Sequence, residues 1–190
     1  MIIGVNGVAQ SGKDTIGTYL IENYGYERRA FADKIKEAAL LLDPIVQTAE
    51  VASEIDLRLS MWVDLFGWEQ AKAHPEVRRT LQRFGSEVGR TIFGETVWID
   101  LLFKNGTPDN LVITDCRFPN EAEAIKKHGG MVWVVQRPGY TPALGHISDT
   151  ALTDWEFDAT LLNDGTVQGL YAQVDRLLWP NELRFGNFIH

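Results

Sequence analysis

Short apolar runs alternate along the chain with longer stretches in which apolar residues recur at helical spacing. An apolar run bounded by turn residues is typical of a buried strand, and such runs predict strands at 2–6, 29–32, 111–114, 131–136 and 159–162. The helical spacing predicts helices at 13–23, 33–42, 96–104, 120–128 and 167–178, and another that opens at Pro75 with an apolar stripe at Val77, Leu81, Phe84 and Val88. Strands that alternate with helices favour parallel βαβ units and a three-layer α/β sandwich.

The stretch 44–74 departs from this alternation. Its acidic and apolar residues suit a helix, but Gly67 and the tryptophans Trp62 and Trp68 indicate an inserted flap rather than a part of the core. The sequence contains no internal repeat, low-complexity tract or domain linker. A single domain over 1–190 is therefore expected, with a helical insert at about 44–74. The aromatic and Asn-rich segment 180–190 predicts no particular role.

The composition is that of an ordinary globular protein, with 45% hydrophobic and 23% charged residues among 190. Cys116 is the only cysteine, which excludes an intrachain disulfide and favours a reducing compartment. No apolar stretch approaches the roughly 20 residues of a membrane span, and the N-terminus lacks the features of a signal peptide. The formal net charge of −8 argues against a general duplex-DNA binder, although a few focused cations can still hold a nucleotide. We therefore expect a soluble cytoplasmic protein without a membrane or nucleic-acid polymer as partner.

A glycine-rich segment follows the first predicted strand and opens the first predicted helix. Its residues match the G-x-x-x-x-G-K core of the Walker A phosphate loop, and they are Gly7, Val8, Ala9, Gln10, Ser11, Gly12 and Lys13. Glycines let successive backbone N–H groups turn toward a phosphate, and the helix N-terminus adds partial positive charge. Lys13 would then reach the β- and γ-phosphates. The segment predicts a site for ATP with Mg²⁺.

Carboxylates near this loop are candidates for holding the metal. The Walker pattern normally has Ser or Thr after the lysine for Mg²⁺, whereas this chain has Asp14 followed by Thr15. Either Asp14, directly or through water, or Thr15 could take that role. Asp115 ends the strand predicted at 111–114, where phosphate-loop enzymes need an acidic group that orders Mg²⁺ or its waters. A simple turn cap is the alternative for Asp115.

Three further polar residues follow Asp115. Because ligands of open α/β sheets bind outside the carboxyl ends of the strands, Arg117 is expected to face the cleft. Its planar guanidinium suits a phosphate, and an ordinary surface arginine is the alternative. Asn120 and Glu121 are equally well explained as substrate ligands or as the cap and first turn of the next helix.

Five segments spread through the chain have a distinctive pattern. They are 12–15 (Gly-Lys-Asp-Thr), 31–36 (Phe-Ala-Asp-Lys-Ile-Lys), 81–90 (Leu-Gln-Arg-Phe-Gly-Ser-Glu-Val-Gly-Arg) with Trp98, 114–121 (Thr-Asp-Cys-Arg-Phe-Pro-Asn-Glu) and 163–166 (Asn-Asp-Gly-Thr). In this order they resemble the bacteriophage deoxynucleoside monophosphate kinases, a branch of the P-loop nucleotide kinases. The Gly-Lys-Asp-Thr variant is the most specific segment, so the departure at Asp14 supports the resemblance. The resemblance implies a five-stranded parallel sheet, a monophosphate-binding region and a lid.

The resemblance also implies site residues. Those expected to bind the acceptor nucleotide are Asp33, Lys36, Gln82, Glu87, Arg90, Trp98, Arg117, Asn120 and Glu121. Arg90 would contact its phosphate and Trp98 would stack on its base, while a solvated helix face or, for Trp98, a core position is the alternative. The loop with Asn163, Gly165 and Thr166 would pass the adenine of ATP, or form a turn before a helix.

The segment 137–152 is expected to form the lid. Related phage kinases carry His-x-Ser-Glu here, whereas this chain has His146, Ile147, Ser148 and Asp149, so its carboxylate is shorter. Arg137 directly follows the fourth strand. It is the cation on the lid side that would stabilise the transferring phosphoryl group.

Taken together, these features predict ATP- and Mg²⁺-dependent phosphorylation of deoxynucleoside monophosphates to diphosphates, with Lys13, Asp115, Arg117 and Arg137 as catalytic residues. Two alternatives stay open: a small-metabolite kinase of the nucleoside or dephospho-coenzyme A type, and a nucleotide-dependent switch or ATPase. The sequence determines neither which bases are accepted nor whether the protein is a monomer or a homodimer. If the protein is phage-encoded, its place is the host cytoplasm.

Overall fold

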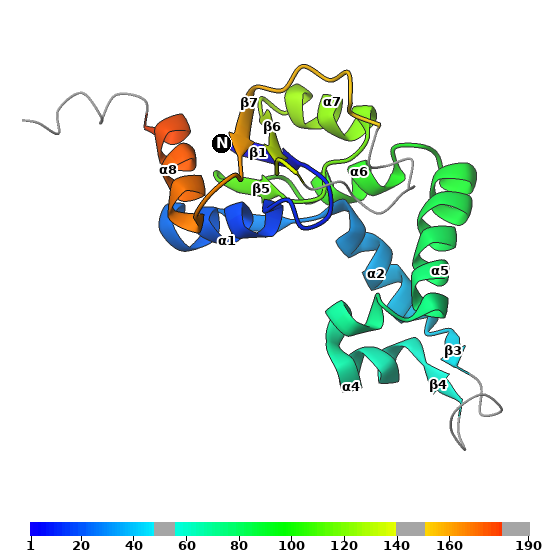
Figure 1. Ribbon diagram of the computed structural model, residues 1–190. Helices are drawn as coiled ribbons and strands as arrows, with labels where there is room; N and C mark the ends of the chain where they lie inside the picture. The colour runs from blue at the N-terminus through cyan, green and yellow to red at the C-terminus, as the bar shows by residue number, and fades with distance from the viewer. Residues whose placement is uncertain (48–55, 140–150, 180–190) are drawn as a thin grey trace, which may run out of the picture. The chain divides into compact units, whose positions relative to one another are not determined.

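The computed structural model describes residues 1–47, 56–139 and 151–179 (Figure 1). The chain forms two compact units. The first comprises Met1–Ala30 and the described part of Gly106–His190, and the second comprises the described part of Phe31–Asn105. No helix within the described ranges is long and apolar enough to cross a membrane.

The first unit is built on a five-stranded sheet in which every pairing is parallel. Its strands lie in the order β2-β5-β1-β6-β7, so β1 is central. Their bounds are Ile2–Asn6 for β1, Glu27–Arg29 for β2, Leu111–Ile113 for β5, Met131–Gln136 for β6 and Ala159–Leu162 for β7. A central strand is covered on both faces, which explains why the apolar run in β1 is continuous and not alternating. The predicted five-stranded parallel sheet is confirmed.

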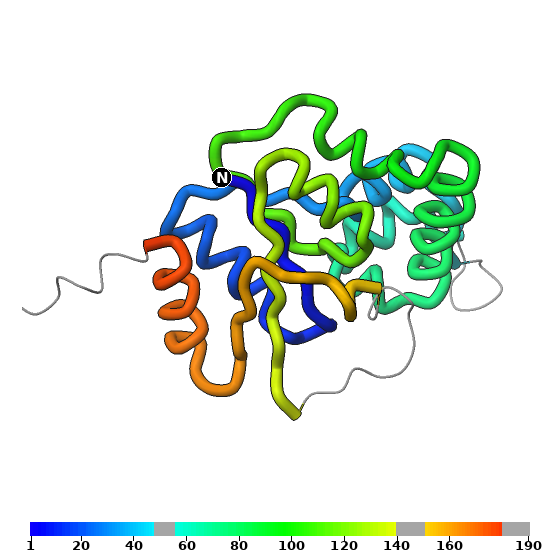
Figure 2. The backbone as a smooth tube through the Cα atoms, turned by 90° about the horizontal axis from the view of Figure 1, so that it is seen from above, coloured from blue at the N-terminus to red at the C-terminus, as the bar shows by residue number. Residues whose placement is uncertain are grey.

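Helices cover both faces of this sheet. Figure 1 shows α1 (Lys13–Tyr24) below it and α7 (Pro119–Lys127) above it, with α8 (Val167–Leu178) at the left next to α1, and Figure 2 shows α8 again beside α1. The three-layer sandwich is therefore confirmed. Fully buried side chains from the sheet, α1 and α8 form the main core, and they include Ile3, Val5, Ile16, Leu20, Trp133 and Leu161. Burying each such side chain stabilises the fold by about 1.5–3 kcal/mol.

The second unit is mainly helical and has its own core. Its elements are α2 (Phe31–Leu42), β3 (Ile45–Gln47), β4 (Leu57–Arg58), α4 (Leu59–Ala71), α5 (Pro75–Arg83), η1 (Phe84–Phe93) and α6 (Val97–Phe103). The strands β3 and β4 form a two-stranded antiparallel sheet. Buried side chains from α2, β3, α4 and α5 meet in one cluster, consisting of Ala39, Val46, Leu59, Ala71 and Val77.

The structure differs from the predicted elements in two places. The second strand was predicted at 29–32, but β2 is Glu27–Arg29, and Phe31 already opens α2. As a short edge strand with exposed residues, β2 lacks the apolar run that marks a buried strand. The segment 44–74 contains α4 and also the strands β3 and β4, which were not predicted. Residues 48–55 of that segment lie outside the described residues.

The segment after α5 is a π-helix, η1, instead of the continuous α-helix that the stripe from Val77 to Val88 predicts. Two of its glycines are buried against a tryptophan from α6. The indole N–H of Trp98 donates a 2.8 Å hydrogen bond to the carbonyl oxygen of Gly85, and a Cβ atom at Gly89 would lie 2.3 Å from the Trp98 ring. A π-helix is rare and usually short, and here it lets a large ring pack directly on backbone.

Candidate active site

The carboxyl edge of the five-stranded sheet gathers residues that the sequence singled out. The phosphate loop 7–13 follows β1, Asp115 and Arg117 follow β5, Arg137 follows β6, and Asn163 follows β7. Parallel strands end at one edge, so short loops after each of them present these side chains on one side of the sheet. This is where an open α/β sheet binds its ligand.

Lys13 is folded against the phosphate loop. Its side-chain nitrogen Nζ donates hydrogen bonds of 2.5 Å to the carbonyl oxygen of Gly7 and 2.7 Å to that of Val8. The residue is 8% exposed although it carries a charge. A buried ammonium group needs such hydrogen-bond acceptors. A phosphate bound in the loop would offer Lys13 an anionic acceptor in place of these neutral carbonyl oxygens.

The loop has the backbone of a phosphate cradle. Gly7 and Gly12 have φ values of 148° and 113°, which L side chains rarely adopt. A Cβ atom at Gly7 would lie 2.6 Å from Ser11 Oγ and 2.7 Å from the carbonyl oxygen of Val135. Ser11 is fully buried, and its hydroxyl has no hydrogen-bond partner among the described residues. A buried hydroxyl without a partner in a glycine-lined turn is suited to donate a hydrogen bond to an anion.

Gln10 stands at the top of the loop in a left-handed conformation, with φ of 60°. Such a conformation is uncommon outside glycine and is found at functional turns. Arg137 reaches over from the end of β6, and its guanidinium donates a 3.1 Å hydrogen bond to the Gln10 carbonyl oxygen. Arg137 is exposed. The predicted lid cation therefore lies against the phosphate loop itself.

The residues predicted to hold Mg²⁺ lie at the start of α1 and at the end of β5. Asp14 is exposed and Thr15 half-buried in the first turn of α1, and Asp115 is half-buried just after β5. The described residues contain no cluster of three or more His, Cys, Asp or Glu side chains able to hold a metal ion by themselves.

A cavity of about 360 Å³ opens beside the phosphate loop, entirely within the first unit. Arg117 and Arg137 both line it, so two guanidinium groups from different strand ends share one space. The rest of its lining is Asn6, Gly7, Val8, Val134, Val135, Gln136, Leu152, Thr153 and Phe157. Two cations beside a phosphate loop suit a second phosphate group.

Sequence reasoning missed several of these lining residues. Asn6, the last residue of β1, donates a 2.9 Å hydrogen bond through Nδ2 to the carbonyl oxygen of Cys116 and so joins two strand ends. Its position just before the glycine loop was the available signal. Leu152 is the last residue of the predicted lid and Phe157 follows it, and neither carries diagnostic chemistry. Burial raises the pKa of the Cys116 thiol well above its usual value, which argues against a nucleophilic cysteine here.

Glu121 is buried and acts as a cap. Its carboxylate accepts hydrogen bonds of 2.8 Å from the backbone N–H of Arg117 and 3.1 Å from that of Phe118. These contacts match the cap interpretation of Glu121, and they fix the backbone that carries Arg117. Asn120 is half-buried in the first turn of the same helix.

The loop between β7 and α8 contacts the phosphate loop. Asn163 donates a 2.8 Å hydrogen bond through Nδ2 to the carbonyl oxygen of Ser11. Thr166 caps α8 by accepting a 3.1 Å hydrogen bond from the backbone N–H of Gly169. Gly165 is exposed between them. The sequence had predicted all three as neighbours of the adenine ring.

The remaining predicted acceptor residues lie in the second unit. Asp33 and Lys36 form a 3.0 Å ion pair on α2, and the ammonium of Lys36 lies 5.7 Å from the ring centroid of Trp68. Both members of the pair are half-buried. This arrangement holds a cation and an anion in fixed positions on one helix face.

Four further acceptor candidates stand on α5, η1 and α6. Gln82 and Glu87 are exposed, and Glu87 pairs with Arg83 at 3.2 Å. Arg90 is half-buried, 3.8 Å from Glu95. Trp98 is buried against η1, so its described contacts are those of a core residue. The lid residues His146 and Asp149 and the segment 180–190 lie outside the described residues.

A family model for deoxynucleotide monophosphate kinase matches residues 66–174, more than half of the chain. The chain belongs to this family. The match includes residues of both compact units. The family that the sequence resembles is thereby confirmed, and with it the prediction that the protein is a kinase.

Individual members of the deoxynucleotide monophosphate kinase family extend the match. A protein of Acanthamoeba polyphaga mimivirus, provisionally named a deoxynucleotide monophosphate kinase, is 28% identical over 92% of this chain and 94% of its own length. The deoxynucleotide monophosphate kinase of Escherichia phage RB69 is 31% identical over 54% of this chain, but the match spans only 44% of that enzyme. Shikimate kinase from Aquifex aeolicus superposes with a TM-score of 0.47 at 15% identity, over 96% of this chain and 99% of that one. A likeness that distant carries no conclusion about ligand or reaction.

Proposed function

We propose that this protein transfers the γ-phosphoryl group of ATP to the phosphate of a deoxynucleoside monophosphate, which yields a deoxynucleoside diphosphate and ADP. The observation that carries the proposal is the phosphate loop, with Lys13 held on it and a buried, unpartnered Ser11 hydroxyl inside it. Membership of the deoxynucleotide monophosphate kinase family supports the choice of acceptor.

The donor half of the reaction uses the phosphate loop. On binding of the triphosphate, Lys13 leaves the carbonyl oxygens of Gly7 and Val8 and bridges the β- and γ-phosphates. Asp14, Thr15 and Asp115 are the residues that would hold Mg²⁺ or its waters, and the ion would neutralise charge between the phosphates. The loop N–H groups and the N-terminus of α1 add fixed partial positive charge.

The acceptor half uses guanidinium groups. Arg117 and Arg137, which share the cavity beside the loop, hold the acceptor phosphate and the transferring group. An acceptor phosphate oxygen attacks the γ-phosphorus, a new P–O bond forms, and the bond from that phosphorus to the β–γ bridging oxygen breaks, so ADP departs with the electron pair. No general base is required, since the attacking oxygen is already ionised at pH 7.

The proposal is tested by ADP release from MgATP in a coupled assay with each ribo- and deoxynucleoside monophosphate as acceptor. Turnover that depends on a deoxynucleoside monophosphate, with the diphosphate identified as product, is the expected result. Acceptor-independent ADP release would contradict it and indicate an ATPase. Turnover with a nucleoside or another metabolite, and none with monophosphates, would indicate a small-metabolite kinase.

A further inference from the structure

One side chain of the loop between β7 and α8, that of Asn163, is hydrogen-bonded to the phosphate loop. The Asn163 Nδ2 atom lies 2.8 Å from the carbonyl oxygen of Ser11, and the two residues are 152 positions apart in the chain. The Asn163 backbone is itself anchored, because its N–H donates a 2.7 Å hydrogen bond to the carbonyl oxygen of Gln136 at the end of β6. Its side chain is therefore presented from a fixed point on the sheet edge.

The approach is close enough that it depends on the absence of a side chain at Gly12. A Cβ atom there would lie 2.9 Å from Asn163 Nδ2. Gly12 is also the N-cap residue of α1, with φ of 113°. A glycine is therefore favoured there for two reasons, its left-handed backbone and the space that Asn163 occupies. Asn163 is half-buried in this position. A side chain placed so tightly against backbone is suited to holding that backbone.

The hydrogen bond has a geometric consequence for the phosphate loop. In a trans peptide, the carbonyl of one residue and the N–H of the next point in opposite directions. When Asn163 holds the Ser11 carbonyl outward, the Gly12 N–H is turned to the opposite side. Arg137 holds the preceding carbonyl, that of Gln10, in a similar way. Two consecutive carbonyls at the top of the loop are thus held by side chains from the ends of β6 and β7.

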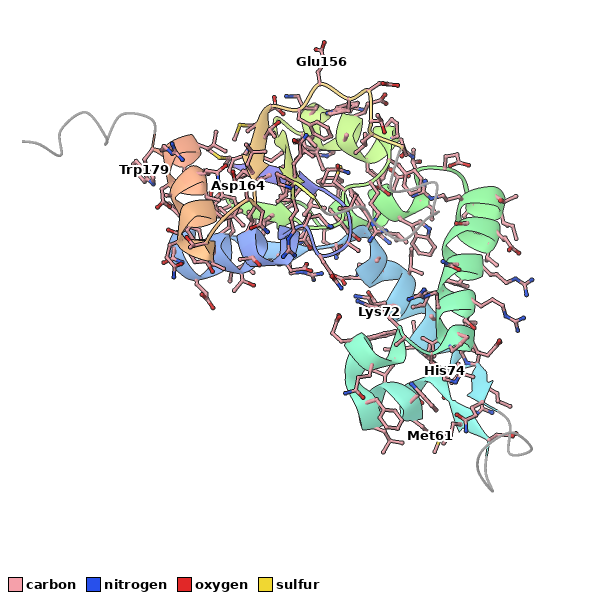
Figure 3. All side chains as sticks on the ribbon, in the orientation of Figure 1. Met61, Lys72, His74, Glu156, Asp164 and Trp179 are labelled. Atoms are coloured by element: carbon pink, nitrogen blue, oxygen red, sulfur yellow. The ribbon has the colours of Figure 1, made fainter. Side chains whose placement is uncertain are left out.

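We infer that Asn163 is a positioning residue of the phosphate loop, whose amide orients the Gly12 N–H toward the triphosphate of the donor nucleotide. It acts on the phosphates through the loop, so its effect does not depend on the adenine base. The inference rests on the proposed function, because it assumes that the loop binds a triphosphate. The next residue, Asp164, is exposed and labelled in Figure 3, and Gly165 and Thr166 remain available to the base.

Binding of inorganic tripolyphosphate with Mg²⁺, compared with binding of MgATP, separates the two roles of Asn163. Removal of the amide in Asn163→Ala should weaken both ligands by the same factor, about 3- to 10-fold, as expected for one lost neutral hydrogen bond. Asn163→Asp keeps the shape but places a carboxylate beside the Ser11 carbonyl, so it should weaken both ligands at least as much. Isothermal calorimetry on the full chain gives both affinities.

Gln173→Ala is the matched control. Gln173 donates through Nε2 to the carbonyl oxygen of Leu162 and accepts through Oε1 from its N–H, each at 2.8 Å, so it holds the same loop to α8 without touching the phosphate loop. This variant should lose stability in urea unfolding and bind tripolyphosphate like the parent. If it weakened tripolyphosphate as much as Asn163→Ala, general loosening of the loop would explain both, and the inference would be wrong.

Other outcomes also decide the matter. If Asn163→Ala weakened ATP and left tripolyphosphate unchanged, Asn163 would be a ligand of the base. If Asn163→Asp bound both ligands like the parent, the donated hydrogen bond would have no role. A parent protein that bound neither ligand would contradict the proposed function itself, which is a different result from either of these.

Discussion

At the scale of single residues, the most informative feature is the pair of short hydrogen bonds from Lys13 to its own loop. They offset part of the cost of burying an ammonium group, which is strongly unfavourable when the group lacks partners. The same side chain would bind the transferring phosphoryl group. Lys13 therefore serves both the shape of the phosphate loop and the chemistry that we propose.

Replacement of Lys13 by alanine should lower kcat/KM for phosphoryl transfer by about 10²-fold or more, as for other preorganised charge contacts. The reason is that no other cation of the loop can reach the bridge between the β- and γ-phosphates. Steady-state kinetics with the preferred acceptor gives the number, and circular dichroism shows whether the variant is folded.

Lys127→Ala is the control for charge alone, because Lys127 is an exposed lysine at the end of α7. It should retain parental activity. A folded Lys13→Ala variant with nearly full turnover would contradict the assignment of the phosphate loop.

At the scale of elements, η1 packs closely against Trp98 of α6. Its buried Gly89 lets the Trp98 ring lie against backbone, and the indole N–H donates to the Gly85 carbonyl oxygen. In an ordinary exposed helix Gly→Ala is stabilising by up to about 1 kcal/mol. At Gly89 we expect the opposite, a loss of stability on substitution by alanine.

We expect Gly89→Ala to destabilise the protein by about 1–3 kcal/mol or more, because the added Cβ would overlap the Trp98 ring in a packed environment. The free energy of unfolding from urea titration measures this. Ser86→Ala, at an exposed position of the same helix, should change it by less than about 0.5 kcal/mol. Equal effects of the two substitutions would show that the close packing at Gly89 is not important for stability.

Asp158 joins α7 to the start of β6. Its carboxylate accepts a 2.6 Å contact from Lys126 and a 2.7 Å hydrogen bond from the backbone N–H of Val132. Burial alone would raise its pKa, but these partners outweigh burial and lower the pKa below the usual value for Asp. A carboxylate with a lowered folded pKa contributes stability above its unfolded pKa, near 3.9, and loses it as the pH falls through the folded value.

Asp158→Asn should therefore reduce the free energy of unfolding at pH 7 by about 0.5–1 kcal/mol and reduce the loss of stability below about pH 4. Urea titrations at a series of pH values between 3 and 7 measure both. Glu156→Gln changes a carboxylate that projects into solvent (Figure 3) and should alter neither quantity. If the free energy of unfolding of Asp158→Asn depended on pH as that of the parent does, the lowered pKa of Asp158 would not contribute to acid unfolding.

The elements that the sequence predicted well are those with a clear apolar pattern. The run of β1 and the turn glycines after it define both the strand and the loop, because a buried strand and a phosphate cradle each need particular residues. The strand β2 was misplaced because an exposed edge strand places no such demand on Glu27 and Arg28. The π-helix could not be predicted for another reason. The apolar stripe through Phe84 and Val88 fits an α-helix equally well, and the packing of Trp98 on Gly89 is a contact between two elements that the local pattern does not encode.

The candidate site followed the same logic. Arg137 and Asn163 could be assigned to the site from the sequence since each directly follows a strand that ends at the ligand-binding edge. Their actual partners, the carbonyl oxygens of Gln10 and Ser11, depend on loop geometry that no local pattern encodes. Phe157 was missed because an aromatic residue after a loop has the same appearance in a core as in a binding site.

At the scale of the whole molecule, the two compact units have separate hydrophobic cores. Ile16 is fully buried in the core of the first unit and Leu59 in that of the second. Each core draws its residues from its own unit. A loss of packing in one core should therefore act first on the unit that contains it.

Ile16→Ala and Leu59→Ala should each lower the free energy of unfolding by about 2–5 kcal/mol, the usual range for an aliphatic side chain removed from a core. Native-state hydrogen exchange should localise the effect: Leu59→Ala should lower amide protection within 31–105, and Ile16→Ala within the sheet unit. The two variants serve as controls for each other. Equal loss of protection in both units from either substitution would show that the cores unfold as one.

The central position of β1 has a consequence for biosynthesis. Ile2 pairs with Leu111, and Ile3 pairs with both Val112 and Met131, so β1 is synthesised more than 100 residues before the strands that flank it exist. At 5–20 residues per second that delay is on the order of 10 s. The second unit, whose contacts lie within 31–105, can fold during the delay. The phosphate loop is thus made well before the strands that flank β1, and the apolar run of β1 before it stays exposed to chaperones until they are made.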